Sequence, residues 1–138
     1  ESYRMDDAEF ALMTLGSMTG AAKDTIDEAR EAGKKVGLVK IKTFSPFPVD
    51  ALKQALSGIK ALGVVDRSVD FRWNCGPMYR ETLGVLYRLG RHLPAASFIG
   101  GLAGADLTIE HFHRVINATE ALLDGPVPDE PVWLNAND

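Results

Sequence analysis

Cysteine is almost absent from this sequence. The single residue, Cys75, excludes an internal disulfide and a metal site built from several cysteines. One free cysteine is compatible with a reducing cytoplasm, where we expect the protein to reside. No apolar run approaches the roughly 20 residues that a membrane span requires. There is also no dense Lys/Arg cluster, and 19 acidic residues outnumber 15 basic ones, so the sequence indicates neither a membrane nor a nucleic-acid partner.

The remaining composition is ordinary for a globular domain. The 138 residues are 46% hydrophobic and 25% charged, which suits one compact domain with its own core. The chain opens with Glu1 rather than Met, and the polar residues 1–7 predict a linker that leaves a preceding domain. Residues 8–124 are the predicted domain, and the proline-rich residues 125–138 are a predicted C-terminal tail.

Short apolar runs ended by turn residues predict four buried β-strands. These runs are residues 10–15, 36–41, 61–65 and 95–99. Amphipathic stretches predict helices at residues 21–32, 48–56 and 78–89, and a last one that begins after an N-cap at Thr108. Gly33 is placed to end the first of these helices. Because strand–helix–strand units form right-handed parallel crossovers, we predict an α/β fold with an open, mostly parallel sheet flanked by helices.

Four loops leave the carboxyl ends of these strands, where ligands sit in such folds. They are residues 16–20, 43–48, 66–77 and 100–106. The first loop, GSMTG, offers Ser17 and Thr19 at a helix N-terminus, where unpaired N–H groups attract anions. It matches neither a GxGxxG nor a Walker pattern, so a tight turn with a Ser or Thr cap is the favoured interpretation.

Other polar residues allow a functional and a structural interpretation. Asp66 and Arg67 end a predicted strand, and such a pair serves more often as an ion pair or a cap than in catalysis. Cys75 has no histidine near it in sequence and is interpreted as a small buried hydrophobe. His111 and His113 do not share a helix face, so they form a poor zinc pair. One is expected to be partly exposed and the other to cap or pack.

Aromatic residues gather around the third loop. Phe71, Trp73 and Tyr79 are suited to an adhesive surface, while Trp73 is equally suited to filling the core. Both interpretations stay open at this point. The sequence by itself contains no catalytic constellation.

Three stretches in order carry a family resemblance. They read ALMTLGSMTGAAKDTIDEAREAGKKVGLVKIKTFSPFP, KALGVVDRS and FIGGLAGADLT. Together they resemble the second domain of the large (α-type) chain of pyruvate:ferredoxin oxidoreductase and its 2-oxoacid relatives, over about Ala8 to Leu123. That domain has the fold of the transketolase C-terminal domain. The sequence departs from the family where a glycine-rich stretch reads VDFRWNCGP, and where a Gly-Gly-Arg-Asp turn reads AGAD and lacks the arginine.

The resemblance implies a part in a multisubunit enzyme that decarboxylates a 2-oxoacid and passes its acyl group to coenzyme A. Thiamine diphosphate, Mg and iron–sulfur clusters are expected in the parent complex and none in this domain. The resemblance implies a non-catalytic assembly domain whose partners are the other domains and subunits, with no catalytic, cofactor-binding or metal-binding residues of its own. The weak candidates for anion or interface contact are Ser17, Thr19, Arg67, Arg72, Gly101, Gly104 and Asp106.

Two alternatives remain. The first is a stand-alone module that binds a small molecule or an anion through residues 16–20 and 100–106. The second is a domain that lines the access of coenzyme A, with Arg67 or Arg72 as the anion-seeking residue. The departures from the family pattern are compatible with an aromatic or branched 2-oxoacid, or with a different neighbouring subunit.

Overall fold

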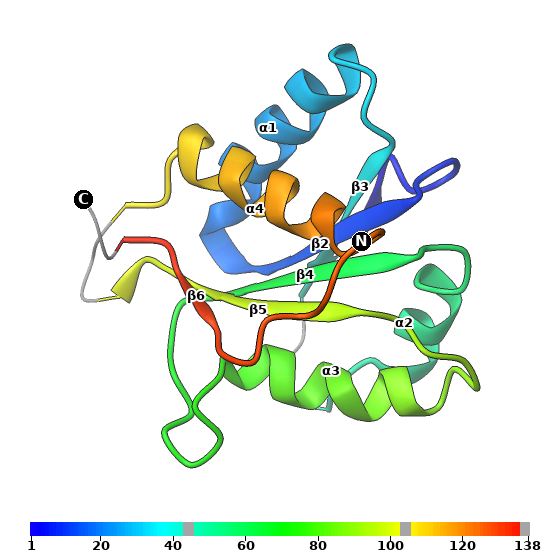
Figure 1. Cartoon of the computed structure of the whole chain (residues 1–138), viewed down its shortest axis with the longest axis vertical. Helices are drawn as coiled ribbons and strands as arrows, with labels where there is room; N and C mark the ends of the chain where they lie inside the picture. Colours follow the sequence, from blue (N-terminus) through cyan, green and yellow to red (C-terminus); the bar gives the residue numbers. More distant parts are fainter. Residues whose placement is uncertain (43–45, 103–105, 136–138) are drawn as a thin grey trace.

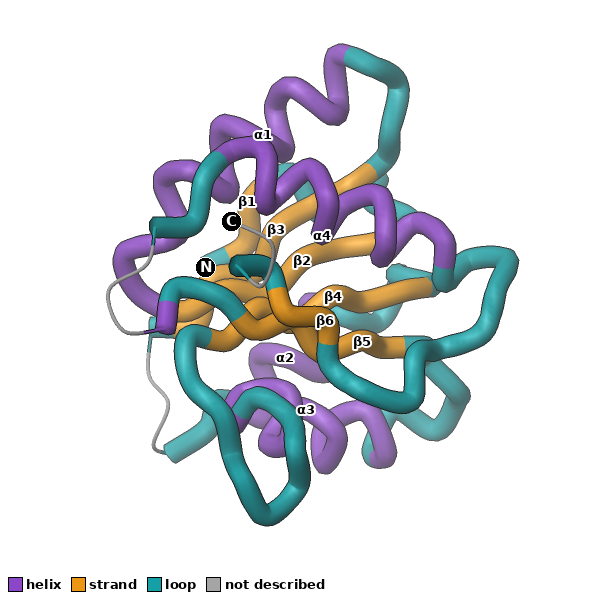
Figure 2. The backbone as a smooth tube through the Cα atoms, turned by 60° about the vertical axis from the view of Figure 1, so that its left-hand side comes forward, coloured by secondary structure: helices purple, strands orange, loops and turns teal. Residues whose placement is uncertain are grey.

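A twisted sheet forms the middle layer of the protein, with helices on both sides (Figures 1 and 2). The structure is a computed structural model that describes residues 1–42, 46–102 and 106–135. Six strands pair in the order β1-β3-β2-β4-β5-β6. They are β1 (Ser2–Tyr3), β2 (Phe10–Leu15), β3 (Val36–Ile41), β4 (Ala61–Asp66), β5 (Ala95–Ile99) and β6 (Val132–Trp133). Among the strands of the described residues, β1 alone runs antiparallel to its neighbour, so the predicted open, mostly parallel α/β sheet is confirmed.

The helices are distributed equally over the two faces of the sheet. They are α1 (Thr19–Glu31), α2 (Val49–Ala55), α3 (Pro77–Tyr87) and α4 (Ile109–Ala121), with a short 3-10 turn, η1 (Gly16–Met18), before α1. Figure 2 shows α1 and α4 on one face and α2 and α3 on the other. None of the helices in the described ranges is long and apolar enough to cross a membrane.

Strand alternation divides the core into two halves. In β2, Phe10 and Leu12 point into the core under α1 and α4, whereas Ala11 and Met13 point into the core under α2 and α3. Successive side chains of a strand face opposite sides of a sheet. Because both faces are covered, the strands read as continuous apolar runs, which is why they could be predicted from sequence.

The predicted end of the first helix is confirmed. Gly33 has a φ of +93°, and its N–H donates to the carbonyl of Arg30 at 3.0 Å. The N–H of Lys34 donates to the carbonyl of Ala29, also at 3.0 Å. These two bonds form a Schellman motif, in which glycine tolerates the left-handed conformation that the motif requires.

Both terminal segments contribute to the sheet. Residues 1–7, predicted as a linker, contain β1, which pairs with Val39 and Leu38 of β3. The predicted tail contains β6, which pairs with Phe98 and Ile99 of β5. Strands of two residues have no periodicity that a sequence could display. The domain boundaries themselves stay a prediction.

Candidate functional site

The carboxyl ends of β2 and β4 meet at the point where the chain changes faces. After β2 the chain continues into α1 on one face, and after β4 it continues into α3 on the other (Figure 2). Such a topological switch point is the usual ligand position in open α/β sheets. A pocket of about 540 Å³ lies there. It is lined by Leu15, Gly16, Met18, Val65, Asp66, Arg67, Ser68 and Pro77.

Asp66 is a buried carboxylate that lines this pocket. Its carboxylate accepts hydrogen bonds from the backbone N–H groups of Met78 at 2.8 Å and Tyr79 at 3.1 Å. These are N–H groups of the first turn of α3, which lack partners within the helix. Burial raises the pKa of Asp66 to about 6, against the opposing effect of the two N–H donors. Any side chain at Gly76 would collide with this carboxylate, so glycine is required there.

Of the interpretations of Asp66 and Arg67, the structure supports the cap, with Asp66 as the capping residue. One carboxylate oxygen of Asp66 is bonded to Met78 and the other to Tyr79, which joins the end of β4 to the start of α3. Arg67 follows on the exposed rim of the pocket. The lining thus combines one cationic residue with apolar ones, which suits an anionic group attached to an apolar body.

The first predicted loop leads into α1 through a short 3-10 turn. Gly16 has a φ of +79°, and the chain then passes through η1 into the helix. The N-cap residue is Met18, in helical conformation and without a side-chain capping bond. The side chains of Ser17 and Thr19 lie outside what the structure describes, so a cap by either of them stays a prediction.

The loop after β5 is closed by the C-terminal segment. Asn135 accepts a hydrogen bond from the backbone N–H of Gly101 at 2.7 Å and donates one to the carbonyl of Asp106 at 3.1 Å. Gly101 therefore uses its N–H within the protein instead of offering it to an anion. Neither Gly101 nor Asp106 lines the pocket at the switch point. Gly104 lies outside the described residues.

The third loop forms a small hairpin that carries two exposed aromatic side chains. Asp70 and Cys75 form an antiparallel bridge, and Arg72 approaches the Asp70 carboxylate at 3.8 Å. Trp73 is 66% exposed and Phe71 is 90% exposed, so the core-filling role of Trp73 is wrong. Tyr79 is only partly exposed, and the adhesive role of these aromatic residues stays a prediction. Asn74 adopts a left-handed conformation, with a φ of +49°, which Asn tolerates better than most residues but does not require, so sequence alone did not predict how the hairpin orients Trp73.

Cys75 lies at the base of the hairpin and is buried. Burial raises the pKa of its thiol, and the nearby carboxylates of Asp70 and Asp66 act in the same direction. A thiol with a raised pKa is a poor nucleophile at neutral pH. The interpretation of Cys75 as a small buried hydrophobe is confirmed.

The two histidines of α4 have separate structural roles. Thr108 accepts a hydrogen bond from the backbone N–H of His111, and the ring of His111 accepts one from the backbone N–H of Thr108 at 3.0 Å, which completes a capping box. His113 contacts the carboxylate of Glu28 on α1 at 3.1 Å. The predicted cap and the partly exposed partner are both confirmed.

The side chains that could hold a metal ion are scattered over the described residues. Within residues 1–42, 46–102 and 106–135, no three His, Cys, Asp or Glu side chains are grouped to hold a metal ion. Iron–sulfur clusters are held by several cysteine thiolates, and this chain has one buried cysteine. The residues of this domain therefore do not fit a cluster.

Sequence reasoning missed the exposed part of α3. Leu83 is 42% exposed and Tyr87 is 89% exposed, beside the buried Val85 and Leu86. A detectable signal was present, because apolar residues at positions 83, 85, 86 and 87 extend around more of the helix than one buried face requires.

Comparisons with known proteins identify the family. A family model for pyruvate:ferredoxin oxidoreductase core domain II matches residues 8–112. The α subunit of NADH-dependent phenylglyoxylate dehydrogenase from Aromatoleum evansii is 78% identical over 139 residues, which covers 100% of this chain and 33% of the relative. The pyruvate synthase subunit PorA of Thermotoga maritima is 37% identical over 134 residues, which covers 97% of this chain and 33% of the relative. The chain thus spans about a third of the length of these relatives.

Two solved structures share the fold. The 2-oxoglutarate:ferredoxin oxidoreductase from Magnetococcus marinus, with 2-oxoglutarate, coenzyme A and succinyl-CoA bound, has a TM-score of 0.58 and 19% identity, covering 86% of this chain and 18% of that one. A split-gene transketolase, in an inactive β4 tetramer, has a TM-score of 0.68 and 14% identity, covering 89% of this chain and 41% of that one. Together with the family model, these similarities confirm the fold suggested by the motifs in the sequence, and the chain belongs to the pyruvate:ferredoxin oxidoreductase core domain II family.

Proposed function

We propose that the chain is core domain II of the α subunit of an NAD-linked dehydrogenase that oxidises phenylglyoxylate or a similar aromatic 2-oxoacid. The observation that carries this proposal is the 78% identity to a phenylglyoxylate dehydrogenase α subunit across the whole chain. The pyruvate synthase subunit is less than half as similar, at 37%. The reaction converts the 2-oxoacid, coenzyme A and NAD⁺ into an acyl-CoA, CO₂ and NADH.

We further propose that this domain is structural and takes no direct part in the reaction. Several of the polar groups that the sequence marked as candidates for contact already interact within the fold. Asp66 binds the start of α3, Arg72 lies near Asp70, and Gly101 binds Asn135. Thiamine diphosphate, Mg and the clusters belong to other parts of the complex, which is expected in the cytoplasm. When bound there, they supply the decarboxylation and electron-transfer chemistry.

The test is a substrate comparison on the complete complex that contains the full-length α subunit. We expect CoA-dependent NAD⁺ reduction with phenylglyoxylate, with a kcat/KM at least tenfold above that for pyruvate. Replacing Asp106 with Ala is expected to leave kcat unchanged, as the structural role requires. Equal use of pyruvate would contradict the substrate, and a large loss of kcat in Asp106→Ala would contradict the structural role.

The pocket at the switch point supports a second candidate function, a share in coenzyme A access. Arg67, which lines the pocket together with the apolar Met18 and Val65, has the charge to meet a phosphate. In the complete complex, Arg67→Gln would then raise the KM for coenzyme A severalfold at constant kcat. Lys60→Gln, at the opposite end of β4, is the matched control. An unchanged KM in Arg67→Gln would rule out this role.

A further inference from the structure

A small hollow is bordered by the hairpin, the first half of α3 and the segment that precedes β6. Its volume is about 140 Å³, and its lining includes Trp73, Tyr79, Ser97, Asp129 and Glu130. Pockets that take a whole substrate or cofactor enclose roughly 300 Å³ or more. The hollow therefore fits the end of one protein side chain better than a free molecule.

The hollow carries negative charge that the domain does not neutralise. Asp129 and Glu130 are exposed, and within the described part of the chain neither carboxylate forms an ion pair or a hydrogen bond. Arg80 also lines the hollow, but it already lies 3.4 Å from the carboxylates of Asp70 and Glu81. Two carboxylates without a counter-charge attract a cation.

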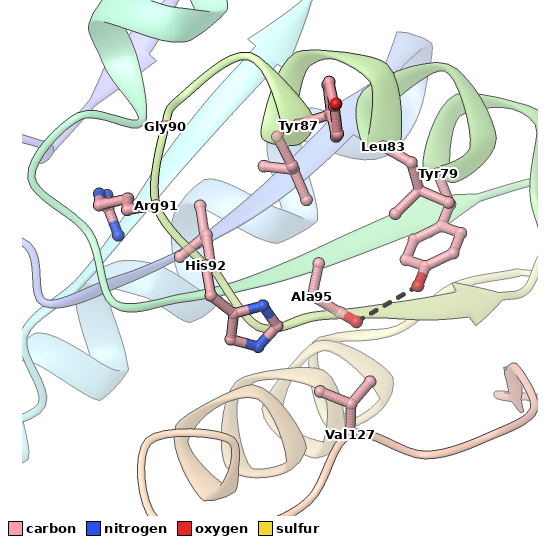
Figure 3. Close-up of a pocket in the computed structure, with 10 residues that line it drawn as sticks. Tyr79, Leu83, Tyr87, Gly90, Arg91, His92, Ala95 and Val127 are labelled. Atoms are coloured by element: carbon pink, nitrogen blue, oxygen red, sulfur yellow. Dashed lines mark hydrogen bonds between the residues drawn. The ribbon is translucent and has the colours of Figure 1, made fainter.

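The aromatic part of the lining suits a cation as well. Trp73 is 66% exposed, and indole is the aromatic ring that binds cations most strongly through its face. The N–H of Trp73 donates to the carbonyl of Asp70 at 3.2 Å, and the hydroxyl of Tyr79 donates to the carbonyl of Ala95 at 3.4 Å (Figure 3). Because these contacts already order the two residues, binding a cation there costs little further conformational entropy.

Ser97 adds a buried hydroxyl to the lining. It is 6% exposed and accepts a hydrogen bond from the backbone N–H of Gly76 at 3.2 Å, its one hydrogen bond among the described residues. A hydroxyl has two lone pairs, so Ser97 can accept a further hydrogen bond. Two carboxylates and this lone pair form a set of acceptors that suits the several N–H donors of a guanidinium or an ammonium group.

The size of the hollow indicates where such a cation comes from. A site for one side chain supplies little of the roughly 1,000 Å² that a stable complex between separate chains buries. A segment of the same polypeptide, by contrast, meets the hollow at an effective concentration of about millimolar, so that a single contact of modest strength is populated. This chain spans 33% of the length of the phenylglyoxylate dehydrogenase α subunit, and the larger part of such a subunit is left to supply the segment.

We propose that this hollow, which we call the cation pocket, receives an arginine or lysine side chain from another domain of the same α subunit. The cationic group lies against Trp73 and pairs with Asp129 and Glu130. The contact fixes this domain against the rest of the subunit, which gives the structural role a specific point of attachment. The proposal rests on the proposed function, in which this chain is one domain of a longer α subunit.

The first test maps the contact by photo-cross-linking in the complete complex. Trp73 is replaced by the photo-reactive p-benzoylphenylalanine, and cross-linked peptides are identified by mass spectrometry. We expect a peptide from the same α subunit, outside the 138 residues of this domain, with an arginine or lysine beside the cross-linked residue. The same replacement at Trp133, which is 40% exposed and does not line the cation pocket, is the matched control and should not capture that peptide.

Three outcomes of this test would overturn the proposal. The first is a cross-link to a second α subunit or to a different subunit, seen as a larger band on a denaturing gel. The second is a cross-linked peptide that contains neither arginine nor lysine. The third is the absence of any cross-link from residue 73 to a segment outside the domain.

The second test removes the charge of the cation pocket. The double variant Asp129→Asn with Glu130→Gln is expected to lower the yield of the cross-link about threefold, because both carboxylates lose their charge. Asp124→Asn, at an exposed acid that does not line the pocket, is the matched control and should leave the yield unchanged. Glu130→Arg should lower the yield further, and changing the mapped arginine or lysine to Glu in the same subunit should restore it. An unchanged yield in the neutral double variant, or no recovery on the charge exchange, would contradict a cationic occupant. Both tests read a contact and not turnover, so their failure would leave the proposed substrate unaffected.

Discussion

The helices over the two faces of the sheet leave different amounts of apolar surface exposed. Over one face, α4 buries Phe112, Val115 and Ile116, and Lys34 at the end of α1 pairs with Glu120 of α4 at 2.5 Å. Over the other face, α3 buries one side and exposes Leu83 and Tyr87 on the other. We call the face under α1 and α4 the closed face, and the face under α2 and α3, which leaves more apolar surface that a neighbour can cover, the open face.

The closed face should be the less tolerant of substitution. A side chain at Gly63 of β4 would collide with the Thr119 hydroxyl of α4 and lie 3.1 Å from the ring of Phe98. We expect Gly63→Ala to lower the free energy of unfolding by about 3 kcal/mol, because a close-packed core resists added volume. Urea denaturation of the 138-residue chain measures this.

Removing the Thr119 hydroxyl provides the control for Gly63→Ala. Thr119 Oγ1 is buried and makes no hydrogen bond among the described residues, so its removal leaves no polar group stranded. The pair Gly63→Ala with Thr119→Ala should recover most of the loss. A double variant as unstable as the single one would show that Thr119 is not the obstacle.

The open face depends on Asp66 to hold α3 in place, and this dependence should vary with pH. The pKa of Asp66 is raised from 3.8 to about 6 in the fold, so protonation favours the folded state. Its contribution to stability is fully present below pH 3.8 and is lost as pH rises through about 6, a change on the order of 2–3 kcal/mol.

The measurement for Asp66 is the difference in unfolding free energy between the chain and Asp66→Asn, taken from pH 4 to pH 7. We expect the advantage of the native residue to shrink steadily over this interval, since Asn does not titrate. A difference that stays constant, or grows with pH, would contradict a buried carboxyl with a raised pKa.

The sequence allowed more of the structure to be predicted for the strands and the closed face than for the open face. The four long parallel strands and the Thr108 cap could be predicted, because apolar runs and capping residues act over a few neighbouring positions. The role of Asp66 as a cap for a helix that begins 11 residues later depends on the tertiary fold, and sequence offered only the general alternative of a cap. The orientation of Trp73 depends on the hairpin geometry at Asn74, which no local pattern specifies.

A smaller effect is expected at the start of α4 on the closed face. Thr108→Ala removes the acceptor for the His111 N–H, and we expect a loss of about 1 kcal/mol in unfolding free energy. Thr108→Ser keeps the hydroxyl and should remain within a few tenths of a kcal/mol of the native chain. If Ser proved as costly as Ala, the methyl group of Thr108 rather than its hydrogen bond would be the stabilising feature.

The smallest effect is expected where the surface is most apolar. Phe71 and Tyr87 are 90% and 89% exposed, so their side chains bury little area within the domain. We expect Phe71→Ser and Tyr87→Ser each to change the unfolding free energy of the 138-residue chain by less than about 0.5 kcal/mol, as is usual for exposed positions. Phe112→Ser, at a fully buried position of α4, is the contrasting control and should unfold the chain. A loss above 1 kcal/mol at Phe71 or Tyr87 would mean that these aromatic residues support the domain itself. A near-zero change would leave their apolar surface to be explained by contact with another protein surface.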